Sequence, residues 1–343
     1  MTTLTIASLD PFDESAMAAW HATYNAAASY QRSYAAPRAL EEMRTQLQME
    51  NPGERLLGFT GVSGDRVVVT GTLSLSLKDN LEQAWLEVHT LPELRRNGHG
   101  SAMLSHLTAE AQAHGRCLLV TEVAYPYDAR VDGSGHPDVE FLRNRGFELG
   151  IADVQRVLDL PADEALLEHL IAAAEPMHRD YEFRQFRGRV PEDIVETYGE
   201  LVGSLLTESP MGDMEFEVQV MDRERIRAEE KISEASGRTK YTTVALADDG
   251  TAAAYTELVV ARHTPEWAFQ WGTLVRPDHR GHRLGVALKA RNLLWLQREC
   301  SRPRLVRTYN AEVNTHMVAV NERMGFRPVE RLGEFQRRVE PGW

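Results

Sequence analysis

The stretch Arg95-Arg96-Asn97-Gly98-His99-Gly100 has a counterpart in Arg280-Gly281-His282-Arg283-Leu284-Gly285, and this pair determines the architecture of the chain. Each stretch follows an apolar, strand-like segment and precedes an apolar helical pattern. Glycine lets successive backbone N–H groups point into one concavity, and the following helix adds its positive end. Both turns are therefore predicted to bind an anion of the size of a pyrophosphate.

The two turns belong to a repeat that spans the chain. Arg95 and Arg280 are 185 residues apart, and the later Arg145-Gly146-Phe147 and Met324-Gly325-Phe326 are 179 apart, counted between their glycines. A single glycine-rich turn would be weak evidence, because ordinary strand-to-helix connections also contain glycine. Two turns with matching surroundings indicate a duplication.

The length of 343 residues suits two domains of ordinary size. Each half runs strand, helix, helix, antiparallel strands, turn, helix and strand, which predicts an α/β (layered α+β) fold. Each domain is expected to hold a mixed, mostly antiparallel sheet with helices on both faces. We expect a first domain over residues 1–160, a linker helix within 161–180 and a second domain over 181–343.

Charge and composition narrow the classes of partner. The formal net charge of -13 at pH 7 disfavours nucleic acid, which needs a basic face, and favours a cationic or amine-bearing substrate. The sequence has no apolar run long enough for a membrane helix, and its start at Met1 lacks the pattern of a secretion signal. We expect no membrane contact and a cytoplasmic location.

Metal chemistry is not expected. Cys117 and Cys300 lie in unlike contexts without metal-ligand spacing, and the twelve histidines are scattered. Both cysteines are expected to be structural thiols. Catalysis would then depend on acid–base groups and positioning.

The order of elements together with Arg-x-x-Gly-x-Gly and the later Gly-Phe resembles the GNAT superfamily of acyl-CoA-dependent N-acyltransferases. Arg95, Gly98 and Gly100 match its pyrophosphate motif fully, whereas Arg283 replaces the first glycine in the second copy. We expect Arg283 to keep a negative φ and its charge to help anchor phosphate. The tandem arrangement is similar to that of mycothiol synthases, in which the carboxy-terminal copy is catalytic.

The resemblance implies that acetyl-CoA is the co-substrate, with its phosphates over the turns and its pantetheine arm between two splayed parallel strands. These strands would be 86–90 with 118–121 and 273–275 with 306–309. The cofactor-binding residues implied in the first copy are Val88, Arg95, Arg96, Asn97, Gly98, His99, Gly100 and Ser101. Those implied in the second copy are Leu274, Val275, Arg280, Gly281, His282, Arg283, Leu284, Gly285, Asn310 and Asn314.

The asparagines distinguish the copies. In the family, an asparagine at the position of Asn314 contacts the coenzyme arm, and the first copy has a Gly/Pro/Asp loop over 125–137 instead. The second copy is therefore expected to perform the chemistry, while the first is a degenerate partner that can still hold acyl-CoA. The reverse assignment stays open, and Asn310, Asn314 and Asn321 also fit helix caps and turns.

Acyl transfer requires a group that takes the proton of the attacking amine and a proton for the departing thiolate. Glu257, on the strand beside the one that leads into the turn, is the best-placed carboxylate, although an exposed strand glutamate is the alternative interpretation. Many relatives use a tyrosine as general acid where this chain has Asn321. Tyr309 is the preferred substitute, His316 is another, and the transfer can also proceed without a dedicated acid.

The acceptor site is predicted from two features. The segment 207–217 corresponds to the acceptor wall in the family, and its Asp213 and Glu215 would hold a cationic amine, unless the acids only solvate the loop. Trp271 alternates with Trp267 and Phe269 along one strand, so it would line the acceptor pocket or belong to the core.

These observations predict an N-acetyltransferase that moves acetyl from acetyl-CoA to a primary amine of a small metabolite, such as an amino sugar, an amino acid or a natural-product intermediate. The alternatives are a non-catalytic acyl-CoA-binding protein and an enzyme that modifies protein amines. The identity of the acceptor and the oligomeric state do not follow from the sequence.

Overall fold

The computed structural model describes residues 3–340, so the predicted domain limits at residues 1 and 343 lie outside the described part. The chain forms two compact units. The first unit holds residues up to 123, together with 133–150 and the segment from Gly333 onward. The second unit holds 124–132 and 151–332.

In the first unit, consecutive strands pair in the order β1-β2-β3-β4-β5, antiparallel except for the parallel pair β4–β5. These strands are β1 (Leu4–Ser8), β2 (Glu54–Ser63), β3 (Arg66–Ser76), β4 (Gln83–Thr90) and β5 (Leu118–Pro126), and the last residues of β12 (Arg327–Arg338) join them. Its helices are α1 (Glu14–Ala28), α2 (Leu40–Gln48), η1 (Pro92–Leu94), α3 (His99–Ala113) and α4 (Pro137–Arg143).

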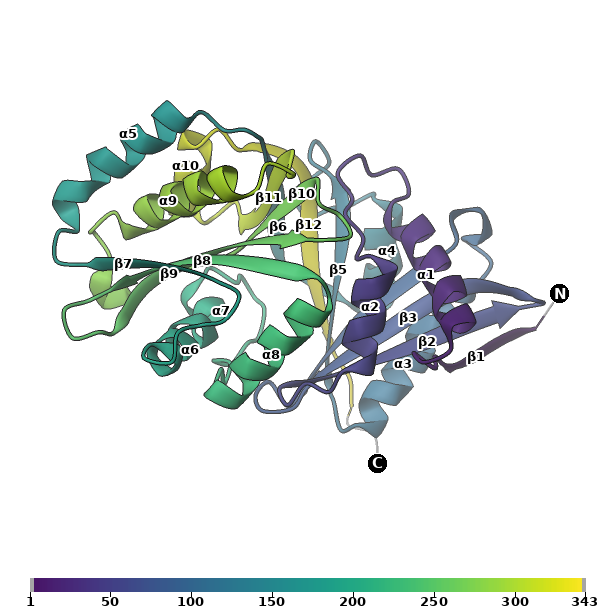
Figure 1. The fold of residues 1–343 in the computed structure, drawn as a ribbon. Helices are drawn as coiled ribbons and strands as arrows, with labels where there is room; N and C mark the ends of the chain where they lie inside the picture. Colours follow the sequence, from purple (N-terminus) through teal and green to yellow (C-terminus); the bar gives the residue numbers. More distant parts are fainter. Residues whose placement is uncertain (1–2, 341–343) are drawn as a thin grey trace. The chain divides into compact units, whose positions relative to one another are not determined.

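Helices cover both faces of the first sheet (Figure 1). On one face, α1 begins where the Asp13 side chain accepts hydrogen bonds from the backbone, and its Trp20 is fully buried and donates to the carbonyl of Phe59. On the other face, α3 packs so closely on Gly71 that a Cβ there would lie 2.8 Å from the sulfur of Met103. Close packing therefore fixes the position of each helix on the sheet.

In the second unit, the strands follow the order β6-β11-β10-β9-β8-β7, with only β10 and β11 parallel. They are β6 (Glu148–Asp159), β7 (Glu182–Arg187), β8 (Arg238–Leu246), β9 (Ala252–Ala261), β10 (Trp267–Val275) and β11 (Leu305–Ala311). The helices are α5 (Glu164–Ala174), η2 (Glu175–Met177), α6 (Val195–Gly203), α7 (Leu205–Glu208), α8 (Arg223–Ala235), η3 (Pro277–His279), α9 (Leu284–Glu299) and α10 (Thr315–Arg323).

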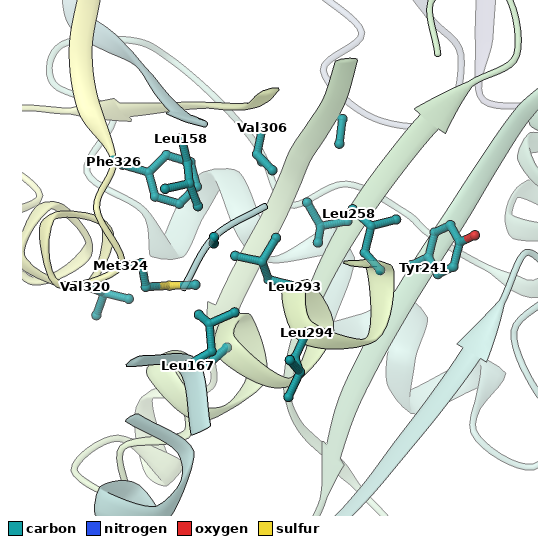
Figure 2. Close-up of a cluster of buried hydrophobic side chains, with 14 of the residues drawn as sticks. Leu158, Leu167, Tyr241, Leu258, Leu293, Leu294, Val306, Val320, Met324 and Phe326 are labelled. Carbon is teal, nitrogen blue, oxygen red and sulfur yellow. The ribbon is translucent and has the colours of Figure 1, made fainter. Parts of the chain in front are cut away.

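The main core of the second unit lies under α9. Leu293 and Leu294 of α9 pack with Leu258 of β9, with Leu167 of α5 and with Phe326 (Figure 2). On the opposite face, α6 and α8 cover β8 and β9. The predicted fold class, a mixed and mostly antiparallel sheet with helices on both faces, is confirmed for both units.

The two units do not coincide with the predicted limits 1–160 and 181–343. Strand β6, which ends the first half of the sequence, pairs antiparallel with β11 from Asp153↔Ala311 to Asp159↔Leu305. The end of β12, in contrast, belongs to the first unit, where the amide of Val339 donates to the carbonyl of Cys117. Backbone hydrogen bonds between strands do not depend on which side chains the strands carry, so an apolar strand can pair with the edge of either of two similar sheets.

A helix is present within the predicted linker. α5 packs on α9 inside the second unit, so this segment is part of a folded layer. Within residues 3–340, no helix combines the length and the apolar character needed to cross a lipid bilayer.

Candidate active site

The two glycine-rich turns have the same backbone shape with the glycine in different places. In the first unit, Arg96 and Gly98 have φ values of 65° and 86°. In the second unit, the corresponding Gly281 and Arg283 have 90° and 54°. The expectation of a negative φ for Arg283 is therefore wrong. The turn needs two left-handed residues just before the helix, and glycine occupies a different one of these two positions in each copy.

The arginines of the second turn bind protein groups. The Arg280 guanidinium lies 3.0 Å from the Glu208 carboxylate. The Arg283 guanidinium donates to the carbonyl of Ala173 at the end of α5, and His282 bonds to the carbonyl of Met177. These contacts brace the turn, so an anion there would be held by the backbone N–H groups and the start of α9.

In the first turn, Arg95 lies over the ring of Tyr30 and 3.6 Å from the Asp138 carboxylate. Asn97 donates to the carbonyl of Leu94, and Ser101 accepts a hydrogen bond from Arg145. His99 is the first residue of α3, and Val88 lies on β4 opposite Gly71.

Both turns leave room for a ligand. A Cβ on Gly98 or on Gly281 would have no neighbour within 4 Å, and one on Gly285 would only touch Val275 at 3.7 Å. Gly100 is tighter, because its Cβ would lie 3.1 Å from the Thr90 hydroxyl. The residues present thus fit a diphosphate over backbone amides in both units.

In both units the two parallel strands pair only at a distance from the turn and separate toward it. β10 and β11 pair in parallel only from Trp267↔Leu305 to Phe269↔Arg307. Strand β10 then has an irregularity between Gln270 and Thr273, where its pairing with β9 shifts register. Gly272 lies in this bulge, and a Cβ there would be 2.2 Å from the Tyr255 hydroxyl oxygen. The bulge and the splay together expose backbone groups of β10 next to the turn.

Glu257 is buried on β9, on the face covered by α6 and α8. Its Oε1 accepts a hydrogen bond from the hydroxyl of Tyr198 and another from the Lys240 ammonium at 2.8 Å. Only 5% of the residue is exposed. Within residues 3–340, Oε2 forms no hydrogen bond.

The electrostatics of this group follow from burial and charge. Burial alone would lower the pKa of Lys240, but the neighbouring Glu257 carboxylate outweighs it and raises the pKa. Burial, together with the same carboxylate, raises the pKa of Tyr198 well above its ordinary value. Lys240 is therefore a fixed cation, and Tyr198 a fixed hydrogen-bond donor, that hold Glu257 in place.

Comparison with known proteins identifies the fold. Residues 206–326 match the sequence model of the acetyltransferase (GNAT) family. The structure matches a tandem GNAT protein from the clavulanic acid biosynthesis pathway over 99% of this chain and 100% of that one, at 26% identity and a TM-score of 0.77. Residues 206–326 thus carry a GNAT acetyltransferase domain, and the whole chain has the fold of a tandem GNAT protein.

Two further structures are similar in fold. A GCN5-related N-acetyltransferase from Sphaerobacter thermophilus matches at 13% identity and a TM-score of 0.65, over 99% of this chain and 97% of that one. A GCN5-related glucosamine N-acetyltransferase region in a fungal multi-domain GH3 β-N-acetylglucosaminidase matches at 12% and 0.64, over 98% of this chain and 38% of that one. Among curated protein sequences, none matches the chain.

The predicted acceptor residues lie in different surroundings. Trp271 is 40% exposed, and its ring is flanked by the cations of Lys240 and Arg238 at 5.5 and 5.6 Å. Asp213 and Glu215 are exposed between α7 and α8. The segment that carries them then packs against α6. The backbone carbonyl of Gln219 lies against Gly203, and that of Met221 lies against Gly199. The amide of Gln219 donates a hydrogen bond to the carbonyl of Gly203.

Tyr309 lies on β11 opposite Gln155 of β6. Side chains alternate along a strand, so Tyr309 shares a face with Arg307, whose guanidinium lies over the rings of Trp267 and Phe269. This is the same face of the sheet as Glu257. The structure thus gathers the predicted Glu257, Tyr309 and Trp271 on one side of the second sheet.

The asparagines of the second copy form hydrogen bonds within the second unit. Asn314 caps α10 by accepting a hydrogen bond from the amide of Met317, and Asn310 accepts one from the fully buried Asn321 at 2.5 Å. Sequence reasoning missed Lys240 and Tyr198. The Asp248-Asp249-Gly250 turn is a sequence signal that could have found Lys240. A hairpin closed by this turn pairs Thr242 with Glu257, so Lys240 lies on the same face of the sheet, diagonally opposite Glu257.

Proposed function

We propose that the second unit transfers the acetyl group of acetyl-CoA to a primary amine of a small metabolite. The observation that carries this proposal is the placement of one buried carboxylate, Glu257, on the strand beside the bulge of β10, directly before a turn shaped for a diphosphate. The match of residues 206–326 to the GNAT family model supports acetyl-CoA as the co-substrate.

In the proposed reaction, Glu257 Oε2 takes the proton of the substrate ammonium while Lys240 and Tyr198 hold Oε1. The free amine attacks the thioester carbonyl, whose oxygen is polarised by backbone N–H groups around Leu274 and Val275. A C–N bond forms and the C–S bond breaks, which releases coenzyme A. Tyr309, on the same face, is the proposed proton source for the thiolate.

A natural-product intermediate is the acceptor class that we favour. The relative from the clavulanic acid biosynthesis pathway covers the whole chain at 26% identity, which supports a small metabolite rather than a protein as acceptor. The surroundings of Trp271 support an acceptor that bears an anionic group besides its amine, since Lys240 and Arg238 flank the ring.

The test is acetyl transfer by the purified chain, measured as thiol release from acetyl-CoA. The acceptors are a panel of amines, some of which carry a carboxylate and some of which do not. We expect release above the no-amine background for carboxylate-bearing amines, and a fall of about 100-fold in kcat for Glu257→Gln, the size typical of a lost general base. Glu234→Gln, at the exposed end of α8, is the matched control. Equal activity of Glu257→Gln and the control would overturn the assignment of the base.

A further inference from the structure

A hollow of about 600 Å³ lies in the second unit, at the opposite end of α9 from the glycine-rich turn. Its lining comes from the end of β7, the start of β8, the end of β9 and the residues that follow α9. Helix α9 begins at Leu284, within the turn, and ends at Glu299, which lines the hollow. A helix of 16 residues is about 24 Å long, so the hollow and the turn are separate places.

The lining of the hollow is rich in arginine. Among residues 3–340, the arginines that line it are Arg187, Arg238, Arg262 and Arg302. The carboxylates of Glu234 and Glu299 also line it and offset half of this charge, which leaves a formal excess of two positive charges. The chain as a whole has a formal net charge of -13. The hollow is therefore a local attractor for anions on an acidic protein.

Three of these arginines are available to a ligand. Elsewhere in the second unit, Arg184 and Arg223 each contact two carboxylates. Within residues 3–340, in contrast, Arg187, Arg262 and Arg302 form no ion pair with a carboxylate. The two glutamates of the lining form none in that part of the chain either. The guanidinium groups thus keep their hydrogen-bond donors for an external anion.

The backbone holds Arg262 in place at the hollow. Its amide donates to the carbonyl of Gly237, which also lines the hollow, at 2.8 Å. A Cβ on Gly237 would lie 3.2 Å from both Cβ and Nε of Arg262, and Gly237 has a φ of 72°. Glycine is required at this position on both counts, because a side chain would be strained and would push against the arginine.

A buried phenol completes the lining. Tyr241 is 4% exposed, and its hydroxyl points away from the hydrophobic side chains of Leu258 and Leu293 (Figure 2). Arg187 lies directly opposite Tyr241 on β7 and hydrogen-bonds to this hydroxyl. Burial raises the pKa of Tyr241 more than Arg187 lowers it. The phenol therefore keeps its proton, which it can donate to an anion.

These groups match the chemistry of a small dianion. Guanidinium forks bind carboxylates and phosphates through paired hydrogen bonds, and Arg187, Arg262 and Arg302 approach from three different elements. The volume falls within the range of ordinary small-molecule sites, roughly 300–1,000 Å³. We propose that this hollow is a binding site for a small dianionic metabolite, a dicarboxylate or a phosphate ester, separate from the site of acetyl transfer.

The first measurement is calorimetry of the full chain with glutarate and with glycerol 3-phosphate. Saturating coenzyme A is present, so that neither anion can bind at a glycine-rich turn. We expect saturable binding of one anion per chain, and the tighter of the two probes identifies carboxylate or phosphate as the preferred acid group. Pentane-1,5-diamine has the length of glutarate and the opposite charge, and should not bind. Absence of saturable binding by both anions would overturn the proposal.

Variants locate the binding site. Arg262→Gln and Arg302→Gln should each weaken binding of the tighter probe about tenfold, because each removes hydrogen bonds to a charged group. Arg323→Gln, exposed at the end of α10, is the matched control. Equal affinity in the control and in the chain that carries both lining substitutions would overturn the site. Thermal unfolding of each variant separates a lost site from a lost fold.

The second measurement uses Cys300, which lines the hollow, as a reporter. In a chain that carries Cys117→Ser, Cys300 is the remaining cysteine, and mass spectrometry follows its alkylation by iodoacetamide. A saturating concentration of the tighter probe should slow this alkylation about tenfold. An unchanged rate would show that the anion binds elsewhere and would overturn the proposal. Neither measurement scores acetyl transfer, so this proposal and the proposed function can fail separately.

Discussion

The two copies keep the same turn and differ in what stands beside it. Each has two left-handed residues before the helix. In the first unit these are Arg96 and then Gly98, whereas in the second unit glycine comes first, as Gly281, and Arg283 follows. Strand β4 pairs regularly with β3 up to Thr90, whereas β10 is interrupted by a bulge at Gly272. Glu87 stands at the corresponding position of β4, and Glu257 stands one strand across, on β9.

This difference shows how a duplicated fold can change its chemistry. The shape of the turn depends on φ values and a helix start, so the proposed anion site would tolerate sequence change as long as one glycine remains. The carboxylate beside it needs only a neighbouring cation, which Arg38 supplies in one unit and Lys240 in the other. The match to the GNAT family model covers residues 206–326, which lie within the second copy.

The largest effect is expected at the turn of the second unit. Gly285→Glu adds a carboxylate where the diphosphate is proposed to lie, and two such charges about 4 Å apart repel by roughly 4 kcal/mol, or about 1000-fold in the kcat/KM for acetyl-CoA. His169→Glu adds the same charge on exposed α5 as a control. Steady-state kinetics check this, and a loss below tenfold would contradict anion binding at this turn.

A large stability change is expected at Lys289, the counterpart of the buried Leu104. Burial lowers the pKa of Lys289 to about 7, so the unfolded chain takes up a proton between pH 10.5 and 7 and stability falls as the pH falls through this window. Lys289→Leu should therefore raise the free energy of unfolding at pH 7 by on the order of 3 kcal/mol.

Denaturant unfolding at several pH values measures this gain. It should shrink by roughly 1 kcal/mol for each pH unit above 7, because the native chain regains its own stability there. A gain that stays constant with pH would mean that packing rather than the charge of Lys289 is responsible.

The bulge offers a smaller effect. Gly272→Ala places a methyl group against the Tyr255 hydroxyl and should destabilise the chain by about 2 kcal/mol, a typical cost of overpacking. Tyr255→Phe removes the nearest atom but keeps two ring carbons at 2.8 and 2.9 Å from the added methyl group, so the double variant should recover only part of the loss. Thermal unfolding of the two single variants and the double variant checks this, and full recovery would show that the ring carbons move aside at no cost.

The smallest effect concerns the exchange of glycine between the turns. Arg96 is exposed with φ of 65°, and Arg96→Gly gives the first turn the glycine of the second. Relief of left-handed strain should stabilise the chain by about 1 kcal/mol, less the entropy that glycine adds to the unfolded state. Denaturant unfolding checks the sign, and destabilisation would mean that the Arg96 side chain supports the turn.

Much of the fold followed from local patterns. The turns, the strands that lead into them and the helices that follow were predicted from glycines, alternation and apolar periodicity, and the structure places all of them. The choice of Glu257 also relied on a local pattern, its place on the strand beside the turn. Lys240 and Tyr198 were missed because they come from another strand and from a helix about sixty residues away.

The sequence by itself determined the duplication and the two glycine-rich turns before α3 and α9, because both depend on residues close together along the chain. Only the tertiary structure decided that β6 completes the second sheet, that Arg283 is left-handed, and that Arg38, Glu87 and His89 meet. The pairing of β6 and the meeting of Arg38, Glu87 and His89 depend on contacts between distant segments, and backbone hydrogen bonding alone does not specify which distant segment is chosen. The left-handed φ of Arg283 follows from the shape of the folded turn before α9.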